Sequence, residues 1–139
     1  MRTLGTQQST KPELGFKELS EQVIGAAIQV HQTLGPGYLE SIYEAALCIE
    51  FDLRSIRYDR QKPISLWYRD RPVGEHRLDL LVEGVLVVEL KAVKALEDIF
   101  FATTRSYLKA LGVGNGLLLN FATMPLTIKR VGREWRKAG

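Results

Sequence analysis

The sequence predicts an α/β fold in which one mixed β-sheet is flanked by helices. Two segments with helical spacing of apolar residues come first, three strand-like segments follow, and a third helical segment precedes the last apolar runs. The 139 residues, 45% of them hydrophobic, are enough for one domain with a buried core. We therefore expect a single domain at residues 17–131, between a flexible polar leader at 1–16 and a basic tail at 132–139.

The first helical segment begins with an apolar pattern at Leu19. Apolar residues recur from there at intervals of three and four, and Ser20 is a suitable N-cap for a helix that ends near Thr33. The Gly-Pro-Gly sequence at residues 35–37 then breaks this helix.

The second helical segment covers residues 38–54 and has a broad apolar side. Glu40, Tyr43 and Glu44 share one face of it, at spacings of three and four. An acid in the first helical turn is favoured by the helix dipole, which by itself explains Glu40. The spacing therefore leaves both a structural and a functional role open for this residue.

Three strand-like segments follow, at residues 64–68, 77–82 and 85–91. A turn at residues 69–72 separates the first from the second, and the Glu83-Gly84 pair separates the second from the third. Successive strands joined by short turns indicate an antiparallel meander.

The remaining segments complete the sheet. A helix is predicted at residues 96–111, and a short apolar run at 117–121 predicts a buried strand that returns to the sheet after this helix. Residues 127–131 predict a final edge strand. The expected order of the core is therefore α-β-β-β-α-β.

Three charged residues lie within the apolar strand segments. Asp79 interrupts one run, and Glu89 and Lys91 lie two residues apart in the next, so their side chains project from the same face. A tight hairpin would bring Asp79 towards them. Unpaired buried carboxylates cost several kcal/mol, which indicates a bound cation, a paired lysine, or both. The alternative is a structural ion-pair network in which Lys91 neutralises Glu89 and Asp79 meets Arg77.

The charge balance permits contact with a polyanion without requiring it: 19 Lys and Arg against 16 Asp and Glu give a formal net charge of +3. Much of the excess lies at residues 129–139, which either contact phosphates or form a solvated terminus. Cys48 is the only cysteine and lies among apolar residues, which excludes an intramolecular disulfide and fits a reducing cytosol. The sequence shows neither a signal peptide nor a membrane span, so we expect a cytoplasmic protein without a membrane partner.

The predicted order of elements, with an Asp on the second strand and Glu-x-Lys on the third, resembles the restriction-endonuclease-like core of the PD-(D/E)XK nuclease superfamily. Within it, Gly37-Tyr-Leu-Glu40-Ser-Ile-Tyr43 and the adjacent Glu44-Ala-Ala-Leu47 resemble the signature of the GxxExxY proteins. Further blocks similar to that group lie at residues 77–82, 88–92, 107–109 and 116–121.

The resemblance implies a metal-dependent nuclease that hydrolyses phosphodiester bonds of nucleic acid, with DNA favoured over RNA. It implies that Glu40, Asp79 and Glu89 are ligands of Mg²⁺ or Mn²⁺ and that Lys91 is the basic catalytic residue. Oxygen ligands suit these hard cations, which lower the pKa of a bound water. The alternative is a catalytically weak or inactive module that keeps the nuclease fold and binds nucleic acid or a partner protein. The sequence leaves a homodimer open.

The third helix departs from the superfamily at one position. Related nucleases often carry Gln-x-x-x-Tyr after the catalytic lysine, and the corresponding residues here are Thr103 and Tyr107. Threonine can donate a hydrogen bond but is too short to span the same gap to a phosphate. We expect both residues to face the nucleic acid. The basic residues predicted to contact phosphates are Arg105, Lys109, Lys129, Arg130 and Arg133.

Overall fold

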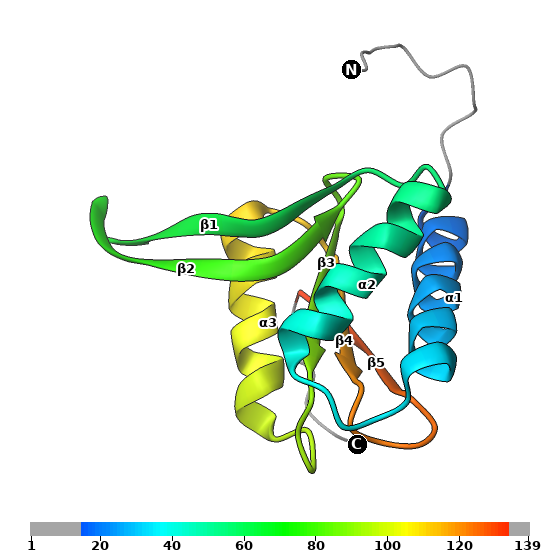
Figure 1. Ribbon diagram of the computed structural model, residues 1–139. Coiled ribbons are helices and arrows are strands. Elements are labelled where there is room, and N and C mark those ends of the chain that lie inside the picture. The colour runs from blue at the N-terminus through cyan, green and yellow to red at the C-terminus, as the bar shows by residue number, and fades with distance from the viewer. Residues whose placement is uncertain (1–14, 134–139) are drawn as a thin grey trace, which may run out of the picture.

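A five-stranded sheet lies between two helical layers in the computed structural model, which describes residues 15–133 (Figure 1). Most of the predicted leader, residues 1–14, and most of the predicted basic tail, residues 134–139, fall outside this range. The elements in chain order are α1 (Phe16–Leu34), α2 (Glu40–Leu53), β1 (Tyr58–Tyr68), β2 (Arg71–Val82), β3 (Leu86–Lys91), α3 (Asp98–Leu111), β4 (Asn115–Asn120) and β5 (Thr127–Gly132). This order confirms the predicted α/β class.

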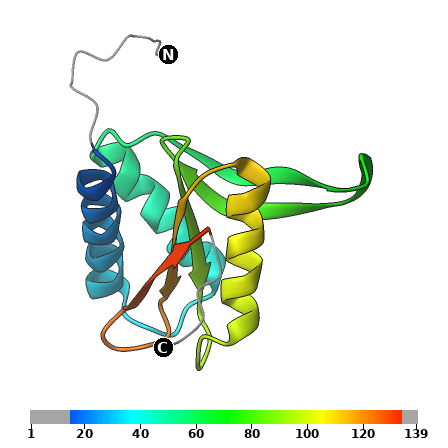
Figure 2. The same ribbon diagram turned by 180° about the vertical axis from the view of Figure 1, so that it is seen from behind.

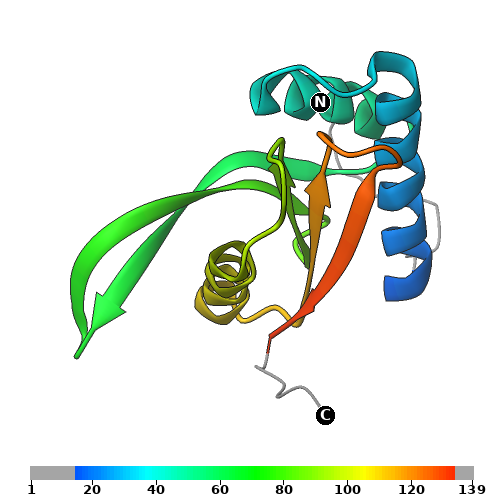
Figure 3. The same cartoon turned by 90° about the horizontal axis from the view of Figure 1, so that it is seen from below.

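The strands lie side by side in chain order, β1-β2-β3-β4-β5. β1, β2 and β3 form the predicted antiparallel meander, and the chain returns through α3 to β4, which runs parallel to β3. β5 pairs antiparallel with β4, so the sheet is mixed. α1 and α2 cover one face of the sheet and α3 covers the other (Figure 3).

Two apolar clusters hold these layers together. The larger lies between the sheet and the α1–α2 layer and contains Tyr43, Phe121 and, as predicted, a buried Cys48. The smaller lies under α3 and contains Leu108 and Leu118. Full burial of one such side chain contributes roughly 1.5–3 kcal/mol, so the clusters fix where the helices sit on the sheet. Within the described residues, no helix is long and apolar enough to cross a membrane.

The first helix begins earlier than predicted. α1 starts at Phe16 with Gly15 in the N-cap position, and Ser20 is buried inside the helix. The Ser20 hydroxyl donates to the carbonyl of Lys17 at 3.4 Å and accepts a hydrogen bond from the Arg130 guanidinium at 2.9 Å. The assignment of Ser20 as the cap was wrong because the first turn is exposed and therefore carries no apolar periodicity.

The first two strands are also longer than predicted. β1 begins at Tyr58 rather than at residue 64, and β2 begins at Arg71 rather than at residue 77. The turn between them consists of Arg69 and Asp70, which both have positive φ, 50° and 63°. Two consecutive left-handed residues match the right-handed twist of a hairpin, which explains how the strands continue so close to the turn.

The outer half of this hairpin leaves the body of the protein. β3 pairs with β2 only from Leu80 to Val82, so beyond Leu80 the first two strands pair only with each other. Figures 1 and 2 show the resulting two-stranded ribbon projecting sideways past α3. We refer to residues 65–75 as the arm.

Candidate active site

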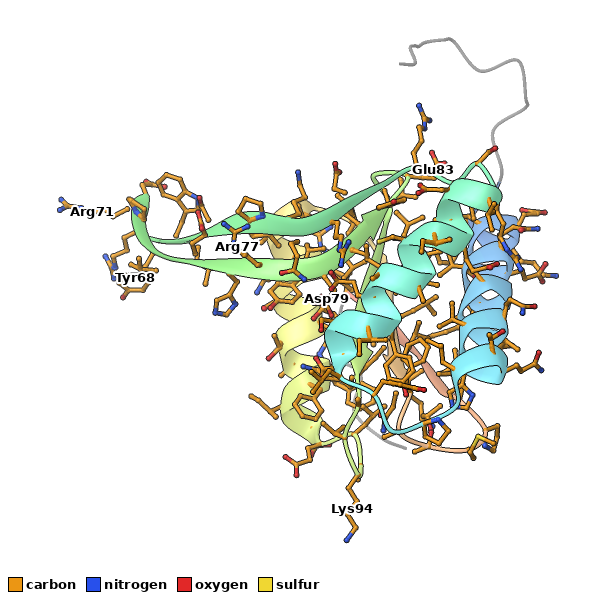
Figure 4. All side chains as sticks on the ribbon, viewed as in Figure 1. Tyr68, Arg71, Arg77, Asp79, Glu83 and Lys94 are labelled. Carbon is orange, nitrogen blue, oxygen red and sulfur yellow. The ribbon has the colours of Figure 1, made fainter. Side chains whose placement is uncertain are left out.

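Two carboxylates meet where β2 and β3 diverge. The ladder between these strands ends at the pair of Leu80 and Val88. One residue further on, Glu89 Oε2 accepts a hydrogen bond from the backbone N–H of Asp79 at 2.7 Å, and Asp79 Oδ2 accepts one from the backbone N–H of Leu90 at 2.9 Å. The side chains thus take the place of backbone carbonyls as acceptors, which fixes both carboxylates at the end of the ladder. Figure 4 shows Asp79 between α2 and α3, near the base of the arm.

The electrostatics of this pair favour protons or cations. Burial raises the pKa of Glu89 to about 8, and the negative charge of Asp79 adds to this effect. Burial also raises the pKa of Asp79, together with the charges of Glu44 and Glu40. The backbone hydrogen bonds oppose both shifts, but burial and acid–acid repulsion outweigh them. The four acids therefore form one electrostatic cluster with an excess of negative charge.

Lys91 lies near this cluster without forming an ion pair in it. Its charge lowers the pKa of Glu89, while its Nζ lies 4.5 Å from the centroid of the Phe100 ring on α3. Arg77 donates to the backbone carbonyl of Gln61 at 3.1 Å. Within residues 15–133, no ion pair joins Lys91 to Glu89 or Arg77 to Asp79, so the structural ion-pair network is wrong. The cation–π contact instead holds the ammonium beside the acids.

Glu40 reaches the same region from α2. It is the first residue of that helix, and its Oε2 accepts a hydrogen bond from the backbone N–H of Ala92, just after β3, at 3.2 Å. This contact brings the predicted third acid to the end of β3, although Glu40 itself is exposed.

Tyr43, three residues after Glu40, has a structural role. Its ring is fully buried and stacks on Phe121 at 4.6 Å between centroids. Its hydroxyl donates to the carbonyl of Gly35 at 2.6 Å and accepts a hydrogen bond from the backbone N–H of Tyr38 at 3.1 Å. The tyrosine thereby fixes the loop between α1 and α2, and with it the point at which α2 begins.

Three further polar residues belong to the site and were not predicted in it. Glu44 is buried, accepts from Arg60 Nε at 2.7 Å and accepts from Gln61 Nε2 at 2.8 Å. Gln61 Nε2 also lies 3.3 Å from Asp79 Oδ1, so one amide connects two acids. Gln61 has a φ of 53°, an uncommon conformation for a residue with a side chain. The spacing of four from Glu40 could have identified Glu44, but no feature of the sequence identifies Gln61.

Tyr107, predicted to face the nucleic acid, is brought close to the acids. It is buried on α3, and its pKa is raised to about 12 by burial and then by the charges of Glu89 and Asp79. Thr103 is half-buried one turn earlier on the same helix. Arg105 is half-buried and Lys109 is exposed in the last turn.

The predicted phosphate contacts near the C-terminus lie elsewhere. Lys129 and Arg130 are on β5, which β3 and β4 separate from β2. Arg130 contacts Ser20 on α1, and Arg133 follows the strand as an exposed residue. The sheet therefore places these residues on the opposite edge from the arm (Figure 3).

The site offers oxygen donors that suit a hard divalent cation. Asp79, Glu89 and Glu40 each supply a carboxylate, and the pKa of Glu89 is raised to about 8 by burial and then by the charge of Asp79, which a bound cation would offset. In the part of the chain that the structure describes, no group of three His, Cys, Asp or Glu side chains is arranged to hold a metal ion. The chemistry of the donors thus fits Mg²⁺ or Mn²⁺, and ligation by all three remains a prediction.

The fold and this cluster together define an α/β protein of nuclease type, with an Asp on one strand and Glu-x-Lys on the next. A model of the PD-(D/E)XK nuclease superfamily matches residues 17–131, and the chain belongs to this superfamily. This confirms the predicted superfamily and its restriction-endonuclease-like fold. The narrower GxxExxY assignment and the roles of individual residues stay predictions.

One solved structure supports the same fold. The crystal structure of SSO0001 is similar with a TM-score of 0.55 and 12% sequence identity, over 86% of this chain and 60% of that chain. This chain thus corresponds to 60% of the length of SSO0001 in that structure, and at this identity the likeness concerns the fold alone. None of the curated proteins compared with the chain matches it.

Proposed function

We propose that this chain is a metal-dependent nuclease of the GxxExxY group that hydrolyses phosphodiester bonds, with DNA favoured over RNA as its substrate. The observation that carries the proposal is the pair of carboxylates of Asp79 and Glu89, held together by backbone hydrogen bonds, with no ion pair to either of them among residues 15–133. A reducing, cytoplasmic setting is part of the proposal, because Cys48 is the only cysteine and is free and buried.

Asp79 and Glu89, with Glu40, would hold Mg²⁺ or Mn²⁺. When bound, such an ion polarises a phosphoryl oxygen and lowers the pKa of a water molecule. The backbone hydrogen bonds to the three carboxylates keep them in place before a cation arrives. This preorganisation reduces the ordering cost of binding.

Lys91 and Tyr107 supply the remaining chemistry from the protein itself. Lys91 is held on the Phe100 ring and would stabilise the additional negative charge that develops on the phosphate, or orient the attacking water. Tyr107 carries its proton at neutral pH, as an ordinary tyrosine does, and its pKa, raised to about 12 by burial and the nearby acids, extends this to alkaline pH. Its hydroxyl can therefore donate a hydrogen bond to a phosphate oxygen. Thr103 is placed one turn before it and is the shorter donor.

Cleavage assays with the purified full chain test the proposal. Labelled DNA and RNA, each single- and double-stranded, would be incubated with Mg²⁺, Mn²⁺ or EDTA. We expect cleavage of DNA with either cation and none in EDTA. Asp79→Asn and Lys91→Met should each lower the cleavage rate by at least about 10²-fold, because each removes a charge from the site of phosphoryl transfer.

Two matched variants control for the loss of a charge. Asp59→Asn changes an exposed residue on β1, and Lys94→Met changes an exposed residue after β3 that points away from the body in Figure 4. Both should keep the wild-type rate. Metal-dependent cleavage that persists unchanged in Asp79→Asn and Lys91→Met would refute the assignment.

A non-catalytic nuclease-fold module is the second candidate. It is favoured by Thr103 in the position of a longer glutamine and by the lack of three converging metal-binding side chains among residues 15–133. Calorimetric titration with Mn²⁺ separates the two functions. Binding that is lost in Glu89→Ala supports the nuclease, whereas no binding, or equal binding by wild type and variant, supports the module.

A further inference from the structure

The arm exposes an unusual set of side chains on a thin ribbon. Trp67 and Tyr68 are 63% and 64% exposed, and Val73, at the register shift on the other strand, is 64% exposed. All residues of β2 from Arg71 to Arg77 are exposed. An isolated two-stranded ribbon is marginally stable in water, and large aromatic residues on its surface gain little there. These side chains are therefore available to a ligand.

The tip of the arm combines its aromatic residues with arginines. Arg69 lies with its guanidinium 5.7 Å from the centroid of the Tyr68 ring, and Arg71 pairs with Tyr68 across the strands. The positive φ of Arg69 and Asp70 fixes the turn that presents them. Arginine contacts phosphates through a planar fork, and contacts to phosphates and sugars position a protein on a duplex without reading its sequence. The tip thus has the chemistry of a surface that binds nucleic acid without reading it.

The arm is also directly connected to the candidate active site. Asp79 and the arm lie on the same strand, with exposed Arg77 between them (Figure 4). Arg77 is held at the base of the arm by its hydrogen bond to the backbone of Gln61. The arm itself has two arginines and two acids, and with Arg77 at its base residues 65–77 carry three arginines, Arg69, Arg71 and Arg77, against Asp70 and Glu75. A polyanion bound at the acidic pair can therefore continue along the ribbon.

The dimensions match a nucleic-acid duplex. From Asp79 to Arg71, β2 spans about 26 Å at about 3.3 Å per residue. Bases along one strand of B-DNA are about 3.4 Å apart, so this length corresponds to roughly eight base pairs. A two-stranded β-ribbon is also narrow enough to enter the major groove.

We propose that the arm, residues 65–75, binds the duplex on one side of the scissile phosphate, with Trp67 and Tyr68 against sugars and base edges in a groove and Arg69 and Arg71 on phosphates. The inference rests on the proposed nuclease function. It assigns substrate binding to the arm, in addition to the cleavage proposed for the acidic cluster. The arm would hold the substrate roughly eight base pairs from the site of cleavage.

Fluorescence of Trp67 tests the contact directly. The chain has two tryptophans, Trp67 and Trp135, so Trp135→Phe leaves the arm residue as the only one. This variant of the full chain would be titrated in EDTA with a 24-base-pair DNA duplex. We expect saturable quenching of Trp67 emission that parallels the anisotropy of a fluorescein label on the duplex. Binding reported by anisotropy without any change in Trp67 emission would overturn the proposal.

The dependence on duplex length tests the geometry. Trp67→Ala and Arg71→Ala should each weaken binding of the 24-base-pair duplex about tenfold and leave binding of an 8-base-pair duplex centred on the site within about twofold. Leu53→Ala, which truncates a 74% exposed residue on α2, is the matched control and should change neither. Equal loss on both duplexes, or no loss on either, would contradict the role of the arm.

Two further outcomes separate this proposal from its alternatives. If the wild type is a dimer by light scattering, and Trp67→Ala is a monomer with unchanged duplex affinity, the arm is a subunit contact and the proposal is wrong. If the wild type binds no duplex at all, the role of the arm fails, and metal-dependent cleavage of single-stranded DNA or of RNA by the same protein would leave the proposed nuclease function standing. If Trp67 emission and the arm variants show no contact between the arm and the duplex while metal-dependent cleavage persists, the proposed function stands and the role of the arm is overturned.

Discussion

Glu89 should make the metal-free protein less stable as the pH rises from about 5 to about 8.5. Its pKa is raised from 4.5 to about 8, so over this range the folded protein retains a proton that the unfolded chain has released. The folded state binds more protons there, and the free energy of unfolding therefore falls with rising pH. The full shift corresponds to about 5 kcal/mol, of which we assign about 3 kcal/mol to Glu89 because its titration is coupled to that of Asp79.

Glu89→Gln should remove this dependence. The amide resembles the protonated acid, and its oxygen can still accept the hydrogen bond that the backbone N–H of Asp79 donates. The variant should match the wild type near pH 5 and exceed its stability by about 3 kcal/mol near pH 8. For a chain of this size that difference corresponds to about 10 °C in Tm.

Calorimetric melting in EDTA at a series of pH values measures the effect. Glu75→Gln changes an exposed glutamate of the arm and should give a profile parallel to that of the wild type. Adding Mn²⁺ near pH 8 should raise the Tm of the wild type, because the cation would bind the carboxylate of Glu89 in place of the proton. The Tm of Glu89→Gln should not change, because the variant lacks this carboxylate. Parallel wild-type and Glu89→Gln profiles between about pH 5 and about pH 8.5 would refute the reasoning.

Three other substitutions test the surroundings of the acids. Tyr43→Phe removes the hydroxyl between Gly35 and Tyr38 and should cost about 1–2 kcal/mol in urea unfolding, whereas Tyr38→Phe should cost little because only its backbone is bonded there. Gln61→Gly should be more stable than Gln61→Ala by about 1 kcal/mol, since only glycine relaxes at a φ of 53°; equal midpoints in urea would contradict this. Thr103→Gln should raise the DNA cleavage rate several-fold, and an unchanged or lower rate would show that the longer amide has no role here.

The order of elements could be predicted because helical and strand periodicity alternate cleanly along the chain. β3 shows why: its residues are buried on both faces, so it appears in the sequence as a continuous apolar run. The first part of β1 was not predicted, because it has no such apolar run. Residues 58–63 are mostly polar and exposed on an edge strand, so they carry no burial pattern. Only their pairing with β2 makes them a strand.

The acidic pair was predictable because charge inside an apolar strand is costly and therefore conspicuous. The supporting residues were not. Gln61 joins the site through a left-handed backbone conformation that its residue type does not favour. Arg60 on β1 donates to Glu44 on α2, which lies 16 residues earlier in the sequence. Such contacts depend on tertiary geometry and leave no local pattern.

The hydrogen bonds at the end of the β2–β3 ladder leave the carboxylates prepared for a cation. Asp79 and Glu89 each use one oxygen for a backbone N–H, and losing either bond would leave a donor unpaired at a cost of about 1–3 kcal/mol. A cation bound through the other oxygens keeps both bonds. On Asp79 that other oxygen, Oδ1, contacts Gln61 Nε2 at 3.3 Å, so this amide would compete with a cation held by Asp79. Gln61→Gly should therefore tighten Mn²⁺ binding in calorimetry even though it removes a hydrogen bond, and weaker binding would show that Gln61 supports the ligand geometry instead.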